Sequence, residues 1–266
     1  MITIRHLTAI FHLTFLTMLQ GSSAFATPAA PIIPLLLSEE VDEKNALTPI
    51  SKEAAAIIQY LEASTDLRFE IRRYPWKRAV ENTKNGEGII FGISKTPERL
   101  QKLIFSEPVF IDQTWLVTRC DSVFKFKKLH DLKGKTIGVV RDTSSGNEFD
   151  RQSNILFKVE DDTGASLGRF MKLYNKRMDA LIYYQSNTVA SKLEANLNKL
   201  YAQHFLTTEK KGEHVFCVLP RPVATVSIHF AIAKDQDLRF FNMIDKALLR
   251  AKNNGDLARI FSKEHQ

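Results

Sequence analysis

The sequence predicts an α/β protein made of two lobes, each with a mainly parallel sheet covered by helices. The first observation is that runs of β-branched and aromatic residues alternate along the chain with segments of helical periodicity, which is typical of parallel sheets. The second is that this pattern starts again at residue 129, where LHDLKGKTIGVV introduces a new strand, a polar turn and a helix. Ligands of such sheets usually bind beyond the carboxyl ends of the strands.

The composition is that of a globular chain with a moderate positive charge. Hydrophobic residues make up 44% and charged residues 25% of the 266 residues, which is enough for one large domain or two small ones. The net charge is +7, but the basic residues are interspersed with acids. We therefore expect solvated charged faces and no nucleic acid partner.

The first 26 residues have the features of an export signal. A basic start at Arg5 is followed by an apolar stretch over 9–19 and by Ala24, Phe25 and Ala26, with small residues where a signal peptidase reads,. The stretch is too short and too polar to favour a membrane span. We expect a periplasmic protein cleaved after Ala26, with a retained N-terminal anchor as the alternative.

The first half of the mature chain predicts the order strand, helix, strand, helix, strand. The strands are IIPLLLSEEV from residue 32, LRFEIRRY from residue 67 and the buried run at 89–93,. Pro75 and Trp76 open the second helix, which Gly86 ends,. The clearest element is the helix over 51–63, with one apolar stripe formed by Ala54, Ile57, Ile58 and Leu61,.

The second half continues with an extended stretch over 104–119, the strand TIGVV at 136–140, and a strand at MDALIYY. A helix over 167–178 is expected to bury one apolar face, formed by Leu167, Phe170, Met171 and Tyr174,. The charge run Glu160, Asp161 and Asp162 predicts a solvated loop rather than an acid/base pair.

The chain is expected to end with a strand and two helices. The strand ATVSIHFAIA alternates apolar and smaller or polar residues, as a half-buried strand does,. Gly255 separates the last short helix from a longer one, whose apolar stripe is Phe240, Met243, Ile244, Ala247, Leu248 and Ala251.

An anion pocket is predicted where the buried run at 89–93 stops. Ser94 follows the strand, Thr96 and Pro97 are a helix start signal, and Arg99 falls in the first helical turn,. A hydroxyl, unpaired N–H groups and a guanidinium aimed at one volume suit a carboxylate or phosphate. The alternative is an ordinary strand-to-helix connection whose arginine forms a surface salt bridge.

Signatures of catalysis and of metal binding are absent from the sequence. It has no G-x-S-x-G, H-E-x-x-H, G-x-G-x-x-G or phosphate loop,, and the histidines of the mature chain lack metal-ligand spacing. Two cysteines permit one disulfide and no cysteine-based zinc site. We expect a monomer that is not an enzyme and needs no cofactor.

Several motifs resemble the family 3 periplasmic solute-binding proteins, the polar amino-acid binding components of ABC transporters. In that family a strand ending Gly-x-Ser/Thr leads to T-x-E-R and then F-S-x-P, matched here by Gly92, Ser94, Thr96, Glu98, Arg99, Phe105, Ser106 and Pro108. DLKGKTIGVVRDTSSG, NKRMDALIYY and the export signal also resemble the family. YPWKRA at 74–79 is similar to a motif of a divergent branch.

The resemblance implies the two-lobed type II periplasmic binding protein fold with two crossover strands. The chain would leave the first lobe near Trp115 and return near Thr225, which gives a first lobe of 27–115 and 225–266 and a second lobe of 116–224. Both cysteines, Cys120 and Cys217, would then lie where the crossovers run side by side. We therefore expect them to form a disulfide, which export favours.

The resemblance also implies a ligand site. Arg99 would grip a ligand carboxylate, helped by Ser94 and the backbone of Gly92. The second lobe would add the hydroxyls of Thr143 and Ser145 and the charge of Arg141. Tyr74 or Trp76 would supply an aromatic wall, although core packing is the alternative for Trp76.

One position departs from the family pattern. Amino-acid binders of the family usually carry an aspartate for the ligand's ammonium group five residues after the position of Asp179, where this chain has Tyr184. We therefore expect a small polar or anionic solute without a strongly held ammonium, for transport by an ABC transporter permease or for a membrane sensor. The alternative is an exported enzyme on the same scaffold, similar to prephenate or arogenate dehydratases.

Overall fold

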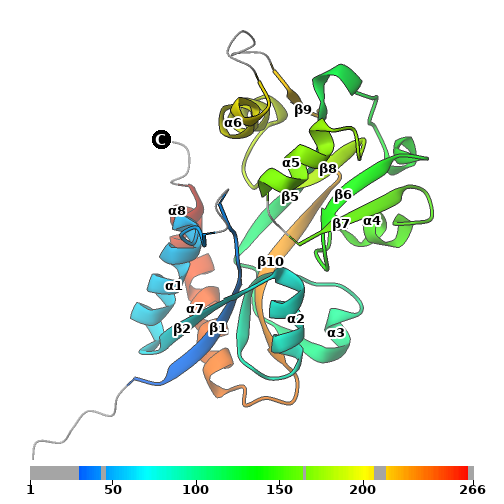
Figure 1. Ribbon diagram of the computed structural model, residues 1–266. Coiled ribbons are helices and arrows are strands. Elements are labelled where there is room, and N and C mark those ends of the chain that lie inside the picture. Colours follow the sequence, from blue (N-terminus) through cyan, green and yellow to red (C-terminus); the bar gives the residue numbers. More distant parts are fainter. Residues whose placement is uncertain (1–29, 43–45, 164–165, 207–213, 263–266) are drawn as a thin grey trace, which may run out of the picture.

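The computed structural model describes residues 30–42, 46–163, 166–206 and 214–262 (Figure 1). The expected signal at 1–26 lies outside the described residues. The fold is mixed α/β, and its strands form one curled sheet in the order β2-β1-β3-β10-β5-β8-β6-β7, with β4 paired to β10 and β9 to β5. No helix of the described part is long and apolar enough to cross a membrane.

The first lobe contains both the first and the last of the described elements. Its helices pack on both faces of the parallel strands β1, β2 and β3, with β10 antiparallel beside β3. Its elements are β1 (Ile32–Ser38), α1 (Lys52–Thr65), β2 (Arg68–Tyr74), α2 (Trp76–Lys84), β3 (Ile89–Ser94), α3 (Arg99–Lys102), β4 (Leu103–Phe105), α7 (Arg239–Asn253) and α8 (Asp256–Ser262).

Local signals in the sequence account for the helix boundaries of this lobe. Ser51 caps α1, since its Oγ accepts a hydrogen bond from the amide of Ala54 at 3.1 Å,. Asp66 ends α1 in the left-handed conformation. Gly86 has φ +82° and donates to the carbonyl of Thr83 just after α2,. The buried stripe of α1 packs on the core formed with α7 and the sheet.

The second lobe is built in the same way around parallel strands. β6 lies between β7 and β8, and the helices cover the faces of this half of the sheet. Its elements are β6 (Thr136–Val140), α4 (Asn147–Gln152), β7 (Lys158–Asp162), α5 (Ser166–Tyr174), β8 (Ala180–Tyr184), α6 (Ala190–Tyr201), β9 (Phe216–Val218) and the 3₁₀ turns Cys120–Ser122, Leu129–Leu132 and Ala202–His204.

Two long strands join the lobes. β5 (Phe110–Arg119) pairs with β10 (Ala224–Ala233) through its first half and with β8 through its second half. Each strand therefore belongs to both lobes, and the expected crossing points near Trp115 and Thr225 lie within β5 and β10. This arrangement places the carboxyl ends of β1, β3, β6 and β8 around the space between the lobes.

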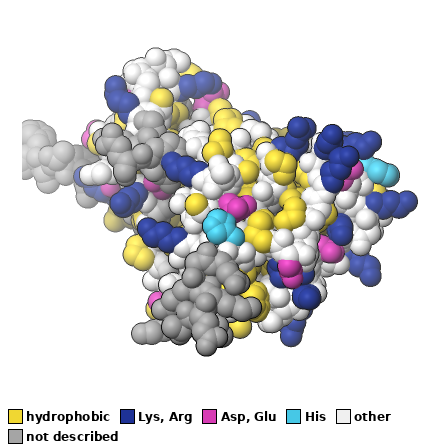
Figure 2. All heavy atoms as spheres, turned by 90° about the horizontal axis from the view of Figure 1, so that it is seen from above, with side chains coloured by type: hydrophobic (Ala, Val, Ile, Leu, Met, Phe, Trp, Pro, Cys, Tyr) yellow, Lys and Arg dark blue, Asp and Glu magenta, His cyan; other side chains and the backbone are white. Residues whose placement is uncertain are grey.

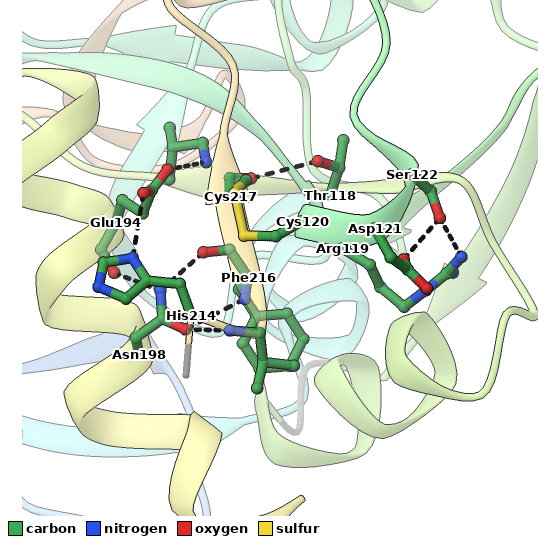
Figure 3. Close-up of a disulfide and its surroundings, with 12 residues drawn as sticks. Thr118, Arg119, Cys120, Asp121, Ser122, Glu194, Asn198, His214, Phe216 and Cys217 are labelled. Carbon is green, nitrogen blue, oxygen red and sulfur yellow. Dashed lines mark hydrogen bonds and ion pairs between the residues drawn. A yellow bond between two sulfur atoms is a disulfide. The ribbon is translucent and has the colours of Figure 1, made fainter. Parts of the chain in front are cut away.

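A disulfide joins Cys120 to Cys217 where the chain enters and leaves the second lobe (Figure 3). The two cysteines are 97 residues apart in sequence. Cys217 lies in β9, and Asn198 of α6 supports this strand. The side-chain amide of Asn198 donates to the carbonyl of Phe216, and its side-chain oxygen accepts from the amide of Phe216. Glu194 accepts from the amide of Val218. β9 is thus held by the disulfide and by two side chains of α6.

Four expectations about buried faces and loops were wrong. On α7 the buried aromatic residue is Phe241, whereas Met243 of the expected stripe is 39% exposed. On α5 the core face contains Phe170 and Leu173, whereas Met171 and Tyr174 are 48% and 38% exposed, because the helix ends at Tyr174 and is rotated from the expected stripe. The charge run at 160–162 lies in strand β7, where Lys172 pairs with Glu160 and Asp162. β10 is half-buried only at its start, since its last six residues lie buried between neighbouring strands.

Basic side chains gather at the outer end of the second lobe, and Figure 2 shows many Lys and Arg side chains at the right-hand end of the molecule. The exposed members near the amino ends of β6, β7 and β8 are Lys125, Lys127, Lys128, Lys133, Lys158, Lys176 and Arg177. They lie away from the carboxyl ends of these strands, so they are separate from the space between the lobes.

Candidate functional site

A cavity of about 350 Å³ lies between the two lobes. The first lobe lines it with the carboxyl ends of β1 and β3, with Trp76 and with Arg99. The second lobe contributes the turn after β6, the first turns of α5 and the end of β8. Both crossover strands contribute as well, so a ligand there would contact both lobes and the connections between them.

A bulge at Gly92 shapes the first-lobe wall. In the pairing of β3 with β10, Phe91 lies opposite Phe230 and Ile93 opposite His229, so Gly92 has no partner in the register,. Its φ of +94° lies in a region that favours glycine,. The bulge exposes the backbone of Gly92 to the cavity.

Arg99 is held at the base of this wall. Its side chain is 6% exposed, and its Nη1 donates to the carbonyl of Ser94 at 2.8 Å and to the Ser94 hydroxyl at 3.2 Å. Thr96 positions the backbone, because its hydroxyl accepts from the Arg99 amide at 3.2 Å. Burial lowers the pKa of Arg99,. No described carboxylate forms an ion pair with it.

The short helix α3 differs from the expected anion site in one respect. The amides of Arg99 and Leu100 donate to the hydroxyl and the carbonyl of Thr96, and the amide of Gln101 donates to the carbonyl of Glu98. These N–H groups therefore have partners within the chain. The guanidinium and the exposed backbone at Gly92, rather than the helix start, are the groups available to an anion.

The second lobe already contacts Arg99 through a backbone carbonyl. Nη2 of Arg99 donates to the carbonyl oxygen of Asp142, and Nε1 of Trp76 donates to the same oxygen at 3.1 Å. Asp142 adopts φ +61° in the turn after β6, which presents this oxygen to the first lobe. Arg99 also lines an outer groove of about 770 Å³. The contact of Arg99 with the Asp142 carbonyl therefore lies between this groove and the cavity.

Hydroxyl groups of the second lobe form a network around Tyr184. Its OH lies 3.0 Å from the hydroxyl of Ser145 and donates to that of Thr143 at 3.0 Å. Asp150 holds the same turn, since it accepts from the Ser144 hydroxyl and from the Ser145 amide. Burial raises the pKa of Tyr184,, so the phenol is neutral near pH 7.

Arg169 of α5 is a second buried guanidinium in the cavity wall, and it was not among the residues predicted to bind ligand. It is 5% exposed, and its Nη2 donates to the carbonyl of Ile182 at 2.5 Å. The predicted apolar face of α5 was rotated from the face that is buried, so Arg169 was not recognised as a buried residue. The only available signal was an arginine directly before Phe170 and close to Leu173, the two residues that form the core face.

Three carboxylates also line the cavity: Glu39, Glu40 and Asp112. They follow β1 or lie on the crossover strand β5, and they are more exposed than the two arginines. Glu40 raises the pKa of Tyr183 and of Tyr201, although burial is the main cause for both tyrosines,.

Of the residues expected to bind ligand, six line the cavity: Gly92, Ser94, Arg99, Trp76, Thr143 and Tyr184. Ser145 lies behind Tyr184 as its hydrogen-bond partner. Tyr74 donates to Glu87 at 2.6 Å instead of facing the cavity. Arg141 is exposed and pairs with Asp161 at 2.7 Å, because that carboxylate lies beside it on β7. Among the described residues no cluster of metal ligands was found.

The sequence matches the model of the bacterial extracellular solute-binding proteins, family 3, over residues 41–265. The chain belongs to this family. It is therefore a solute-binding protein, and the cavity between its lobes is the candidate site for the solute. No curated protein sequence matches the chain.

Solved structures of similar fold include amino-acid-binding proteins. A mutant ArgBP from T. maritima has a TM-score of 0.66 at 20% identity, covering 87% of this chain and 94% of that one. An ancestral arginine-binding protein bound to arginine has a TM-score of 0.66 at 17% identity, covering 90% and 100%. An ancestral amino acid-binding protein, a precursor of cyclohexadienyl dehydratase, has a TM-score of 0.65 at 19% identity, covering 88% and 96%. These likenesses establish the type II periplasmic binding protein fold.

Proposed function

We propose that this family 3 protein is a periplasmic receptor that captures a small solute through a carboxylate or similar anionic group bound by Arg99. The observation that carries the proposal is that Arg99 is buried in the cavity wall without a described carboxylate partner. A buried charge is costly unless it is paired. An anionic solute would supply the missing partner.

The contact with Asp142 supports this role. Its carbonyl oxygen lies against Arg99 and Trp76 from the opposite lobe, at the place where a solute oxygen would bridge the lobes. A carboxylate oxygen accepts a stronger hydrogen bond from a guanidinium than a neutral carbonyl does. We therefore infer that the solute displaces this carbonyl or binds beside it when the lobes close.

We further propose that the lobes are 27–115 with 225–266, and 116–224, and that they move as units about β5 and β10. Closure around the solute would exclude water and strengthen each charge-assisted bond. The protein would then deliver its solute to an ABC transporter permease or present it to a membrane sensor. Family members of this fold that bind amino acids support such a role.

Recognition of an α-ammonium group is not part of the proposal. Tyr184 stands where the resemblance implies an aspartate, and its hydroxyl is engaged with Ser145 and Thr143. A neutral phenol provides no ion pair for an ammonium. The carboxylates of the cavity are Glu39, Glu40 and Asp112, which lie elsewhere in the wall. A cationic group of a solute would have to bind to one of these carboxylates.

A thermal-shift screen of residues 27–266 against amino acids, organic acids and short peptides tests the proposal. We expect the compounds that raise the melting temperature to share a carboxylate or similar anion. Hits should be confirmed by calorimetry. If only uncharged or purely cationic compounds bind, the proposed role of Arg99 is wrong.

A second candidate function is an exported dehydratase. It is favoured by the fold shared with the precursor of cyclohexadienyl dehydratase. Incubation of the protein with prephenate, followed by the absorbance of phenylpyruvate, distinguishes the two functions. We expect no turnover, and turnover lost in Arg99→Ala would replace the receptor proposal with the enzyme.

A further inference from the structure

Arg169 presents a second buried positive charge to the same cavity. Its Nη2 donates to the carbonyl of Ile182 at 2.5 Å and lies 3.5 Å from the carbonyl of Gly138. Its Nε is buried without a hydrogen-bond partner among the described residues. The hydrogen-bond acceptors that the described chain offers to this guanidinium are thus two backbone carbonyls.

No described carboxylate pairs with Arg169. The charge of Asp162 opposes the lowering of the pKa of Arg169 by burial, but no ion pair joins the two residues. Oδ1 of Asp162 pairs with Lys172 at 2.7 Å, and its Oδ2 is buried without a hydrogen-bond partner among the described residues. Leaving a buried guanidinium with unused donors costs more than replacing it by an apolar side chain of similar volume. Packing of α5 does not require an arginine here, because Phe170 and Leu173 form its core contacts.

The surroundings of Arg169 are those of a binding surface. Tyr183, Tyr184 and Tyr201 line the cavity together with Arg169. Arg99 lies in the first lobe and Arg169 in the second. The two guanidiniums therefore line the cavity of about 350 Å³ from opposite lobes.

We propose that Arg169 binds a second anionic group of the solute, so that the site takes small dianions such as dicarboxylates, with one group held by each lobe. The inference rests on the proposed function of Arg99. A dianion provides each buried guanidinium with an anionic partner, which no described carboxylate does, and it makes closure of the lobes depend on both of its charged groups.

The acidic residues of the wall define where the dianion lies. Glu39 and Glu40 follow β1, and Asp112 lies on β5, whereas Arg99 and Arg169 are the deeply buried groups. Repulsion from these carboxylates favours a solute whose two anionic groups point toward the arginines. It also disfavours solutes with a third negative charge.

The test is calorimetric titration of residues 27–266 with the dicarboxylates from malonate to pimelate and with the monoamide of each. The acid and its monoamide have the same length and differ by one charge. We expect wild type to bind its best dicarboxylate at least tenfold more tightly than the matching monoamide. Arg169→Met should remove this preference while it still binds the monoamide, and its melting temperature should not fall, since an unpaired buried charge is removed.

Arg177→Gln is the matched control, because it removes one exposed positive charge from the same lobe outside the cavity. It should leave both affinities unchanged. Equal binding of acid and monoamide by wild type, with binding still dependent on Arg99, overturns the inference and leaves the proposed function intact. The wild-type comparison decides this point even if Arg169→Met does not fold. If Arg99→Ala binds every tested acid as wild type does, the proposed function fails as well.

Discussion

At the end of β3, three residues of the candidate site are joined by short-range hydrogen bonds. Ser94, Thr96 and Arg99 are close in sequence, and their hydrogen bonds join residues no more than five positions apart. Local signals therefore determine their arrangement. Arg169 was missed because its contacts with Gly138 and Ile182 join different elements, and no local pattern reports such contacts.

Position 184 is predicted to control the response to an α-ammonium group. Tyr184→Asp should improve the affinity for an α-amino acid relative to its deaminated analogue about tenfold, because a carboxylate can pair with the ammonium. Calorimetry with such a matched pair measures this ratio. Tyr184→Phe is the control, since it removes the contacts with Ser145 and Thr143 without adding charge and should leave the ratio unchanged. A wild type that already prefers the amino acid tenfold contradicts the interpretation of Tyr184.

His229 is predicted to make stability depend on pH. Its Nδ1 lies 2.8 Å from the carbonyl of Ser106, and its Nε2 is buried without a partner among the described residues. Burial lowers the pKa of His229 below its usual 6.5,. As the pH falls from 6.5 toward the lowered pKa of the folded state, the unfolded chain therefore binds a proton that the folded chain does not. Over this interval the free energy of unfolding falls with a slope of up to about 1.4 kcal/mol per pH unit.

Urea unfolding of wild type and His229→Gln between pH 7 and 5 checks this effect. The variant should lose part of the pH dependence, even if it is less stable throughout. His130→Gln, which changes an exposed histidine, should retain the slope of wild type. Identical slopes in all three proteins would show that His229 does not titrate as described.

At the level of elements, segments with a clear apolar pattern were predicted well, whereas the edge strand β7, the helix α6 and the strand β9 were not. β1, α1, β2, α2, β6, β8 and α7 lie where the patterns placed them. β7 was read as a loop because it is an edge strand whose charges are neutralised by Lys172 and Arg141, and these pairings depend on tertiary structure. The long helix α6 and the short strand β9 were not anticipated.

The two neighbouring leucines of α7 test which face of this helix is buried. Leu248 is 0% exposed in the first-lobe core, whereas Leu249 is 44% exposed. Leu248→Ala should lower the free energy of unfolding by about 2 to 5 kcal/mol through lost contacts and a cavity. Leu249→Ala should change it by less than about 0.5 kcal/mol. Denaturant unfolding measures both, and similar losses would contradict the orientation of α7.

The disulfide between Cys120 and Cys217 is predicted to stabilise the second lobe. It closes a loop with a sequence separation of 97 residues, which in the chain-entropy model contributes roughly 4 to 5 kcal/mol and often less in practice. The double variant Cys120→Ser, Cys217→Ser should have a lower denaturation midpoint than wild type. A reductant should lower the midpoint of wild type and leave that of the double variant unchanged. Mass spectrometry of a non-reduced digest should show the linked peptides. Two free thiols in the oxidised protein would contradict the pairing.

On the scale of the whole molecule, the site exists only because two lobes meet. Motif order and resemblance predicted two α/β lobes with two crossovers, since those features follow from the sequence of strands and helices. The contact of Asp142 with Arg99 and Trp76 was not predicted, because it joins residues 43 and 66 positions apart. The opposed placement of Arg99 and Arg169 likewise depends on how the lobes face each other.

Binding of an anionic solute by Arg99 between the lobes can be measured by titration calorimetry. Residues 27–266 as wild type, Arg99→Ala and Lys95→Ala should be titrated calorimetrically with the tightest-binding acid from the thermal-shift screen. Arg99→Ala should bind it roughly ten- to hundredfold more weakly, equivalent to a charge-assisted hydrogen bond of about 1.5 to 3 kcal/mol, and should remain folded. Lys95→Ala, which removes an exposed charge from the same connection, should bind as wild type does. Unchanged affinity in Arg99→Ala would contradict the account.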